Sequence, residues 1–354
     1  MMRSLRPHLV LLLLLLFSGL AFACEVPVFR YALERWTAHV WTLKVTHQGG
    51  LKPEEAAMVA QIKVVSGPDC NVQVEVIDSP EVSNEGASLT LVAPDGRSVW
   101  NGFAEAGSTE KILHSPVRQK LVDALLRGES LVWIFVRSGE TKADAAALAE
   151  LKKNADAAIL KQSLSKSVVA FGKVDSTTEL DNHLRSAIPL KLSHAIIEVD
   201  RKDPKEEVLL AMLGGDEAPA GPWAAPVFGR GRALPPLPAE RFGDGAVDNT
   251  VGYICGKCSC TVQSQNPGED LLLEADWASH VSAAPVVIEK ALPPLSGLQE
   301  LSPAAPAAKV EATPVHAAPT AKSASFSVSA LIGGSLLLLL LLGLATRHLL
   351  SRND

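Results

Sequence analysis

The sequence lacks the excess of basic residues that nucleic-acid-binding proteins carry. Lysine and arginine together number 33, against 39 aspartates and glutamates, and the net charge is −6. A protein that neutralises phosphates needs a basic patch or stripe, and no such run stands out along this chain. The composition therefore excludes nucleic acid as an expected partner and gives no support for docking on anionic lipid headgroups.

The sequence signatures of several large enzyme classes are also missing. There is no Gly-x-Ser-x-Gly elbow of a hydrolase, no Gly-Lys-Ser/Thr phosphate loop and no dinucleotide fingerprint, and the nine histidines form no His-x-x-x-His pair. These motifs supply the nucleophile, the phosphate cradle or the metal ligands of those enzymes. Their absence favours a role other than catalysis, and we expect no cofactor.

Long hydrophobic runs occur at the two ends of the chain. Residues 1–23 combine two arginines, a short apolar core and a small-x-small cleavage site, as signal peptides do. Residues 326–346 carry no charge, and at about 1.5 Å per residue they would reach about 31 Å as a helix, the thickness of a bilayer core. The basic tail, residues 347–354, would then lie in the cytoplasm. We expect a single-pass protein of a bacterial inner membrane, with the bulk of its chain in the periplasm.

Two further features bear on how the chain is anchored. Cleavage after residue 23 would leave Cys24 at the mature N-terminus, so lipidation is an alternative anchor. The preceding residues fit a lipoprotein signal poorly, because Phe22 occupies a position that takes a small residue. Residues 285–325 are dominated by Pro, Ala and Ser, which predicts a solvated, semi-rigid spacer between the folded part and the membrane.

Between these ends, the pattern of apolar residues predicts two units with the same order of elements. In the first unit, residues 24–128, we expect an N-terminal strand or extended arm, followed by a strand (40–45), a helix from Pro53 and a strand (72–76). A hairpin (89–100) and a helix that begins at Pro116 and is capped by Ser115 complete the unit. In the second unit, residues 129–284, we expect a strand (131–136), a helix (143–163) and a strand (194–199). A helix from Pro204, a hairpin (226–234) and a helix (245–255) follow.

Two units that each run strand–helix–strand and then hairpin–helix resemble tandem thioredoxin-like domains. The resemblance covers about residues 40–260 and implies an α/β fold with two sheets flanked by helices. In that family Pro226 would occupy the place of the cis-proline. Redox thioredoxins carry Cys-x-x-Cys where the first strand turns into the helix, but residues 46–53 and 137–143 contain no cysteine. The resemblance therefore does not carry over the redox activity.

A second resemblance is local. Residues 24–36 (CEVPVFRYALERW) and 258–268 (CSCTVQSQNPG), with residues 128–133 and 226–234, are similar to the signature stretches of a family of exported bacterial proteins that has no assigned activity. This resemblance implies export and brings no mechanism with it.

The sharpest chemical signal is the cluster Cys255, Cys258 and Cys260, in which Lys257 would favour the thiolate form. With Cys24 and Cys70 the chain has five cysteines, an odd number. Cys24 could form a structural disulfide with one member of the cluster and so fix the N-terminal arm. The three thiols could instead exchange disulfides, or bind zinc or cuprous copper with Cys24 or a histidine as fourth ligand.

The remaining candidate binding residues are Arg230 and Arg232, close to Pro226. Two arginines around a glycine could clamp a carboxylate or a phosphate. The alternative is a tight glycine turn with solvated arginines. Taken together, the sequence predicts a membrane-anchored extracytoplasmic binding or scaffolding protein with another envelope protein as its partner. Thiol–disulfide exchange and soft-metal binding are the alternatives.

Overall fold

The computed structural model describes residues 25–80, 86–173, 175, 177–178, 180–215, 218–257 and 262–281. The expected signal peptide, the spacer, the membrane helix with its tail, and Cys24, Cys258 and Cys260 lie outside these residues. Within the described part of the chain, no helix is long and apolar enough to cross a membrane.

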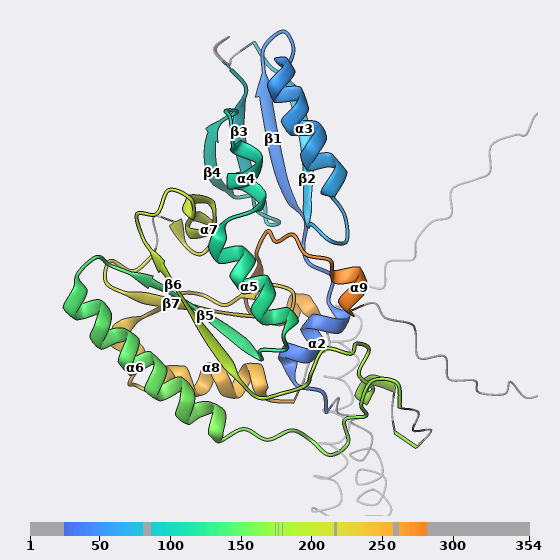
Figure 1. Ribbon diagram of the computed structural model, residues 1–354, viewed down its shortest axis with the longest axis vertical. Coiled ribbons are helices and arrows are strands. Elements are labelled where there is room, and N and C mark those ends of the chain that lie inside the picture. The colour runs from blue at the N-terminus through green and yellow to red at the C-terminus, as the bar shows by residue number, and fades with distance from the viewer. Residues whose placement is uncertain are drawn as a thin grey trace, which may run out of the picture. The chain divides into compact units, whose positions relative to one another are not determined.

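A four-stranded mixed sheet forms the first half of the fold (Figure 1). Its strands lie in the order β2-β1-β3-β4 and are β1 (Trp41–His47), β2 (Val72–Asp78), β3 (Ser88–Val92) and β4 (Ser98–Phe103). β1 is parallel to β2 and antiparallel to β3, and β3 is antiparallel to β4. Helices α3 (Pro53–Val65) and α4 (Ser108–Leu113) share a core with the alternate side chains Trp41, Leu43 and Val45 of β1.

A six-stranded sheet forms the second half. Its path is β10-β8-β7-β5-β6, with β9 paired to β7, and the strands are β5 (Leu131–Arg137), β6 (His194–Asp200), β7 (Trp223–Phe228), β8 (Arg232–Ala233), β9 (Leu237–Pro238) and β10 (Glu269–Asp270). β5 is parallel to β6 and antiparallel to β7, and β7 is antiparallel to β8. The first four strands of this sheet thus repeat the order and directions of the first sheet. The predicted mixed α/β architecture with two sheets is confirmed.

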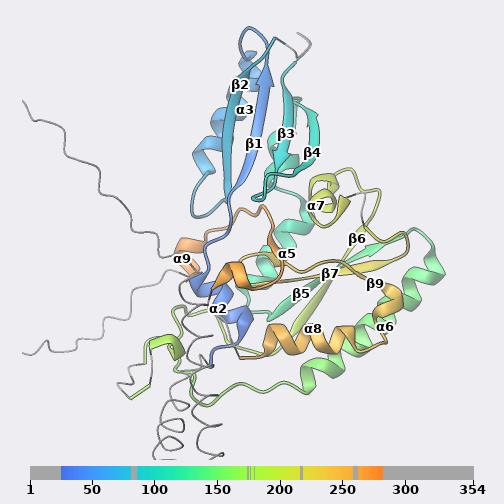
Figure 2. The same ribbon diagram turned by 180° about the vertical axis from the view of Figure 1, so that it is seen from behind.

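Helices cover both faces of the second sheet (Figure 2). On one face, Trp133 and Phe135 of β5 share a core with α6 (Thr141–Leu160) and α8 (Ala246–Cys255). On the other face, Val132 and Ile134 share a core with α5 (Pro116–Leu126) and α7 (Glu207–Met212). β5 is therefore buried on both sides, as its unbroken apolar run predicted. Helix α5, predicted as the end of the first unit, packs against the second sheet.

The N-terminal arm corrects one prediction. Residues expected to be extended form helix α2 (Val28–Arg35), and all of them except Arg35 are buried. The helix packs against the second sheet's core through Phe29 and Tyr31. Arg30 and Glu34 lie one turn apart on one face of the helix, and this polar face is buried as well. The prediction of an extended arm followed instead from the density of branched and aromatic residues.

Two other expectations also need correction. α7 begins at Glu207, not at Pro204, and α4 was not expected. Pro226 lies inside β7, and no peptide bond between described residues is cis. Its carbonyl accepts a hydrogen bond from the Leu234 amide, across the hairpin. Pro226 is therefore a buried strand residue with a trans peptide bond, and not the cis-proline that the resemblance implied.

Residues 269–281, which we call the strap, are hydrogen-bonded to both sheets. The strap contains β10, which pairs with β8, and the short helix α9 (Trp277–Val281). The Trp41 indole donates to the Asp270 carbonyl at 2.7 Å. The Asn71 side chain donates to the Leu271 carbonyl at 3.1 Å and accepts from the Leu273 amide at 3.0 Å. The last described segment thus joins the start of β1 and the approach to β2 to the second sheet.

A buried arginine reinforces this junction. Arg118 of α5 donates to the carbonyls of Lys111 and Ile112 at the end of α4, at 2.7 and 2.6 Å, and to the Leu272 carbonyl of the strap at 3.3 Å. Burial lowers its pKa to about 10, while nearby acidic groups, chiefly Glu206, act in the opposite direction. One guanidinium therefore connects α4, α5 and the strap.

Candidate binding site at a strand-to-helix corner

Each sheet has a corner where its first strand turns into the following helix. In the first sheet β1 ends at His47 and α3 begins at Pro53. In the second sheet β5 ends at Arg137 and α6 begins at Thr141. Neither turn contains a cysteine, so neither can supply a thiol nucleophile.

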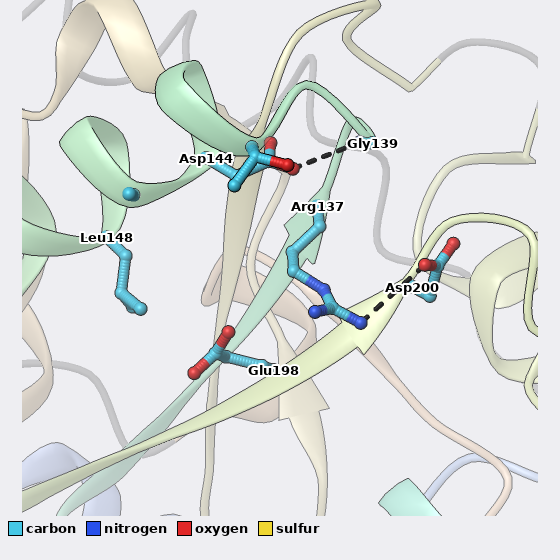
Figure 3. A pocket seen from close by; sticks show the side chains of 8 residues that line it. Arg137, Gly139, Asp144, Leu148, Glu198 and Asp200 are labelled. Carbon is cyan, nitrogen blue, oxygen red and sulfur yellow. Dashed lines mark hydrogen bonds and ion pairs between the residues drawn. The ribbon is translucent and has the colours of Figure 1, made fainter.

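The corner of the second sheet opens into a pocket of about 360 Å³ (Figure 3). The pocket lies at the C-terminal ends of the parallel strands β5 and β6 and beside the first turns of α6. Its lining residues are Arg137, Gly139, Thr141, Asp144, Ala145, Leu148, Glu198 and Asp200. Ends of neighbouring parallel strands next to a helix N-terminus are a common place for ligand sites in α/β folds.

Asp144 organises the turn at this corner. Its carboxylate accepts hydrogen bonds from the Ser138 amide at 2.8 Å, the Ser138 hydroxyl at 2.7 Å and the Gly139 amide at 3.0 Å. Desolvation raises the pKa of Asp144, but these hydrogen bonds and the nearby Arg137 outweigh it and leave the pKa below its usual value. Asp144 is therefore an ionised, already bonded group that fixes the corner.

The partly exposed charges of the pocket come from the strand ends. The parallel register places Arg137 of β5 opposite Asp200 of β6, and the two side chains form an ion pair at 3.6 Å. Glu198 lies two residues earlier on the same face of β6 and is exposed. Figure 3 shows Arg137 and Glu198 on the pocket floor and Leu148 on its α6 wall. This arrangement can bind a polar or cationic group beside an apolar one, and its lining residues include no cysteine.

The corner of the first sheet also has a carboxylate that accepts hydrogen bonds from main-chain amides. Glu55, in the first turn of α3, accepts from the amides of Lys52 and Ala87, both at 2.8 Å. Desolvation raises the pKa of Glu55, but the two amide hydrogen bonds and nearby positive groups leave it lowered. In both corners, then, a carboxylate in the first turn of the helix accepts hydrogen bonds from main-chain amides of the strand-to-helix turn.

Removing the charge of Asp144 is expected to loosen this corner. Asp144→Asn should lower the free energy of unfolding at pH 7 by about 1–2 kcal/mol, since a carboxylate that bonds turn amides is replaced by a neutral amide. The Asp144 pKa is lowered in the folded state, so its contribution is present above the unfolded value of about 3.9. It is lost as the pH falls through the lower folded value. Urea unfolding of both proteins at pH 7 and near pH 3 should therefore show a difference that shrinks in acid, and an unchanged difference would contradict the assignment.

The structure places the described cysteines in apolar surroundings. Burial raises the pKa of Cys255, at the end of α8, and that of Cys70 to about 12. The Lys257 ammonium pairs with Glu25 at 2.5 Å. The expected activation of the cluster by Lys257 is therefore not seen at Cys255. No disulfide joins the two described cysteines, which are both free.

The N-terminal arm lies beside the chain that leads into the cysteine cluster. The Val28 amide donates to the Gly256 carbonyl at 2.9 Å, and Pro27 and Lys257 form an antiparallel bridge. Glu25, which follows Cys24, also donates its amide to the Asn182 side chain at 2.7 Å. The residues next to Cys24 and to Cys258 are therefore neighbours in the fold.

Both candidate arginines contact the protein itself. Arg232 is buried, and each of its guanidinium nitrogens donates to the protein: Nε to the Pro267 carbonyl, Nη1 to Asp270 and Nη2 to the Asn266 carbonyl. The Nε of Arg230 donates to the Leu33 carbonyl of α2 at 2.8 Å. The arginines therefore tie the hairpin to α2 and the strap, and an anion clamp formed by the two is not what this geometry provides.

Comparison of the chain with protein-family models, with curated proteins and with solved structures finds no match.

Proposed function

We propose that this protein is a membrane-anchored, extracytoplasmic binding or scaffolding protein built on two degenerate thioredoxin-like domains. In this proposal the corner pocket of the second sheet contacts an envelope protein. The observation that carries the proposal is that carboxylates, and not thiols, occupy the two strand-to-helix corners. Hydrogen-bonded carboxylates, Glu55 and Asp144, hold the turns where a redox thioredoxin has its thiols.

The topology of both sheets supports the thioredoxin-like assignment. In each sheet a strand–helix–strand unit places two parallel strands side by side, and a third and fourth strand follow antiparallel on the other side. The second sheet also has α7 between its second and third strands and α8 after its hairpin. The membrane anchor and the periplasmic location rest on the terminal hydrophobic segments of the sequence.

Charge reversal in the pocket tests the proposed binding site. Glu198→Lys combined with Asp200→Lys should abolish capture of a partner from detergent-solubilised membranes, because it reverses the potential of the pocket. Glu75→Lys on β2 is the matched control, since Glu75 is also an exposed strand carboxylate that forms an ion pair. The full chain is used as bait, and captured proteins are compared quantitatively. Equal capture by all three proteins, or no stable partner for the unaltered chain, would count against the proposal.

We also propose that a disulfide joins Cys24 to Cys258 or Cys260 and fixes α2 against the second sheet. The neighbouring contacts of Glu25, Pro27 and Val28 with residues 256–257 support this pairing. A disulfide that closes a loop of more than 200 residues typically stabilises a fold by about 2–4 kcal/mol.

Mass spectrometry of the intact, non-reduced protein tests the disulfide. After alkylation in denaturant, a peptide containing Cys24 should be linked to one containing Cys258 or Cys260 and should separate on reduction. Cys70 is the internal control, because it is buried and free and should be alkylated in every sample. A Cys24 that is alkylated or lipidated would contradict the pairing. Free or mixed thiols at residues 255, 258 and 260 would instead favour thiol–disulfide exchange.

Metal binding by the cysteines stays a prediction. Among the described residues no group of three or more histidine, cysteine or acidic side chains could hold a metal ion, and two members of the cluster lie outside these residues. Titration of the reduced full chain with zinc and with cuprous copper measures this alternative directly.

A further inference from the structure

The strap carries acidic side chains that form ion pairs with both sheets. Asp270 pairs with Arg232 of β8 at 3.1 Å. Glu269 pairs with Arg97, in the turn between β3 and β4, at 2.8 Å. Arginine stays charged throughout the pH range in which proteins fold. These two pairs therefore hold the strap through cations that do not titrate.

Two further contacts of the strap acids use histidine. His114, which follows α4, places its Nε2 atom 3.4 Å from Oε2 of Glu274. His39, which precedes β1, places its Nδ1 atom 3.3 Å from Oδ2 of Asp270 and donates its amide to the same oxygen at 2.9 Å. Histidine is the side chain that ordinarily gains its charge between pH 8 and 5. These two contacts are therefore ion pairs only when the histidines are protonated.

Glu274 depends on its histidine more than Asp270 does. The Oε2 atom of Glu274 is buried and accepts no hydrogen bond from the described residues. Asp270, by contrast, is bonded to Arg232 and accepts from the Gln263 side chain at 2.8 Å. Burying a charged oxygen without a partner is costly. We therefore expect protonation of His114 to have the larger effect.

The other charged groups around His114 come from α4 and from the approach to α7. With His114 they line a pocket of about 440 Å³, and they are Glu110, Lys111 and Lys205. Lys111 is already paired with Glu207 at 3.3 Å. Glu110 favours a charged histidine and Lys205 opposes it, so these groups largely offset one another. The direct contact with the strap carboxylate then decides the effect of protonation.

The groups on the strap side keep one charge state over the same pH range. The main chain of Glu274 bridges to that of Cys70, and the Cys70 thiol stays neutral because burial raises its pKa to about 12. Arg118, whose pKa burial lowers to about 10, stays charged and donates to the Leu272 carbonyl of the strap. The protonation of His114 and His39 is therefore what changes in the strap's contacts with the first sheet between pH 5 and 8.

We infer that the strap holds the two sheets together more tightly in mild acid, because His114 and His39 then carry charges opposite the strap carboxylates. Both histidines flank elements of the first sheet, whereas β10 fastens the strap to the second sheet. The added stability is present at about pH 5–6 and is lost as the pH rises through the range in which histidine loses its proton. It is lost again below about pH 4.5, where carboxylates become neutral. The inference does not depend on the corner pocket's role.

Hydrogen exchange of the strap at several pH values tests the inference in the full chain. The amides of Leu273 and Ala275 report opening of the strap, since they donate to Asn71 and Asp69. After division by the intrinsic exchange rate at each pH, the opening equilibrium constant should rise about three- to tenfold from pH 5.5 to pH 8, as two partly exposed ion pairs are lost. The amides of β5 are the internal reference and should not follow this change.

Histidine variants test the assignment to these two side chains. His114→Gln combined with His39→Gln should remove the pH dependence and leave the strap in its weaker state throughout. His114→Arg should keep most of the protection at pH 8, because its charge does not titrate. His47→Gln is the matched control, since His47 also lies near a carboxylate, 3.7 Å from Asp78 at the far end of β1. It should leave the behaviour of the strap unchanged.

Three results would overturn the inference. They are equal protection of the strap at pH 5.5 and pH 8, a pH dependence that survives in the double histidine variant, and a dependence that His47→Gln also removes. Circular dichroism checks that each variant is folded. If the double variant did not fold, His114→Arg would decide, because loss of its protection at pH 8 would show that charge at this position does not hold the strap.

Discussion

Replacing Glu34 with glutamine is expected to lower the free energy of unfolding by about 3–5 kcal/mol, one of the two largest effects we anticipate. The side chains of Glu34 and Arg30 are both fully buried in α2 and form an ion pair at 2.8 Å. Glu34 also accepts hydrogen bonds from the amides of Arg185 and Ser186, at 2.9 and 3.1 Å. Neutralising the carboxylate leaves the buried Arg30 charge without its counter-ion, since the Ser186 carbonyl and hydroxyl that also accept from it are neutral.

Urea unfolding followed by circular dichroism measures this loss. Glu75→Gln is the control, because the Lys44–Glu75 pair is exposed and 3.9 Å apart, and it should change stability by less than about 1 kcal/mol. The paired replacement Arg30→Met, Glu34→Leu should recover much of the loss, since it removes both buried charges together. Equal stability of Glu34→Gln and the unaltered chain would show that the pair does not hold α2 in place.

Arg118→Ala is expected to be similarly damaging, at about 3–4 kcal/mol. The change removes the donor from three carbonyls and leaves the ends of α4 and the strap without their common partner. Hydrogen exchange should therefore increase in α4 and in residues 271–273 before it increases in β5.

An exposed arginine serves as the comparison for Arg118. Arg97, 61% exposed, pairs with Asp95 and Glu269, and Arg97→Ala should cost less than about 1 kcal/mol. If the two variants lost the same stability, or if exchange in Arg118→Ala rose uniformly over both sheets, the junction would not depend on Arg118.

Regular elements were predictable where one strong local signal was present. The unbroken apolar run of β5 predicted a strand buried on both faces. Ser115 and Pro116 predicted the start of α5, and the Ser115 hydroxyl accepts from the Arg118 amide. In each case a few consecutive residues are enough to determine the element. The succession of most strands and helices along the chain followed from the same signals, whereas the order of the strands within each sheet was seen only in the structure.

Features set by distant contacts were not predictable in the same way. In the sequence, Asp270 is one of several acids that follow a turn. In the structure it is buried and bonded to Arg232, which lies 38 residues earlier in the chain. The helical state of α2 depends on enclosure by segments more than 100 residues away.

The candidate site was predictable in part. The turn after β5 was identified as the corner that lacks a cysteine. Glu198 and Asp200 join it only because parallel pairing with β5 brings the end of β6 alongside. Adjacent predicted parallel strands that both end in charged residues were the signal that could have found them.

The strap also sets the order in which the molecule can be completed. Synthesis delivers residues 269–281 after all the other described residues, yet β1 and the start of β2 depend on them for Trp41 and Asn71 contacts. On a growing chain, therefore, the Trp41 indole and the Asn71 side chain gain these partners only when residues 269–281 have been made, so the first sheet is completed last.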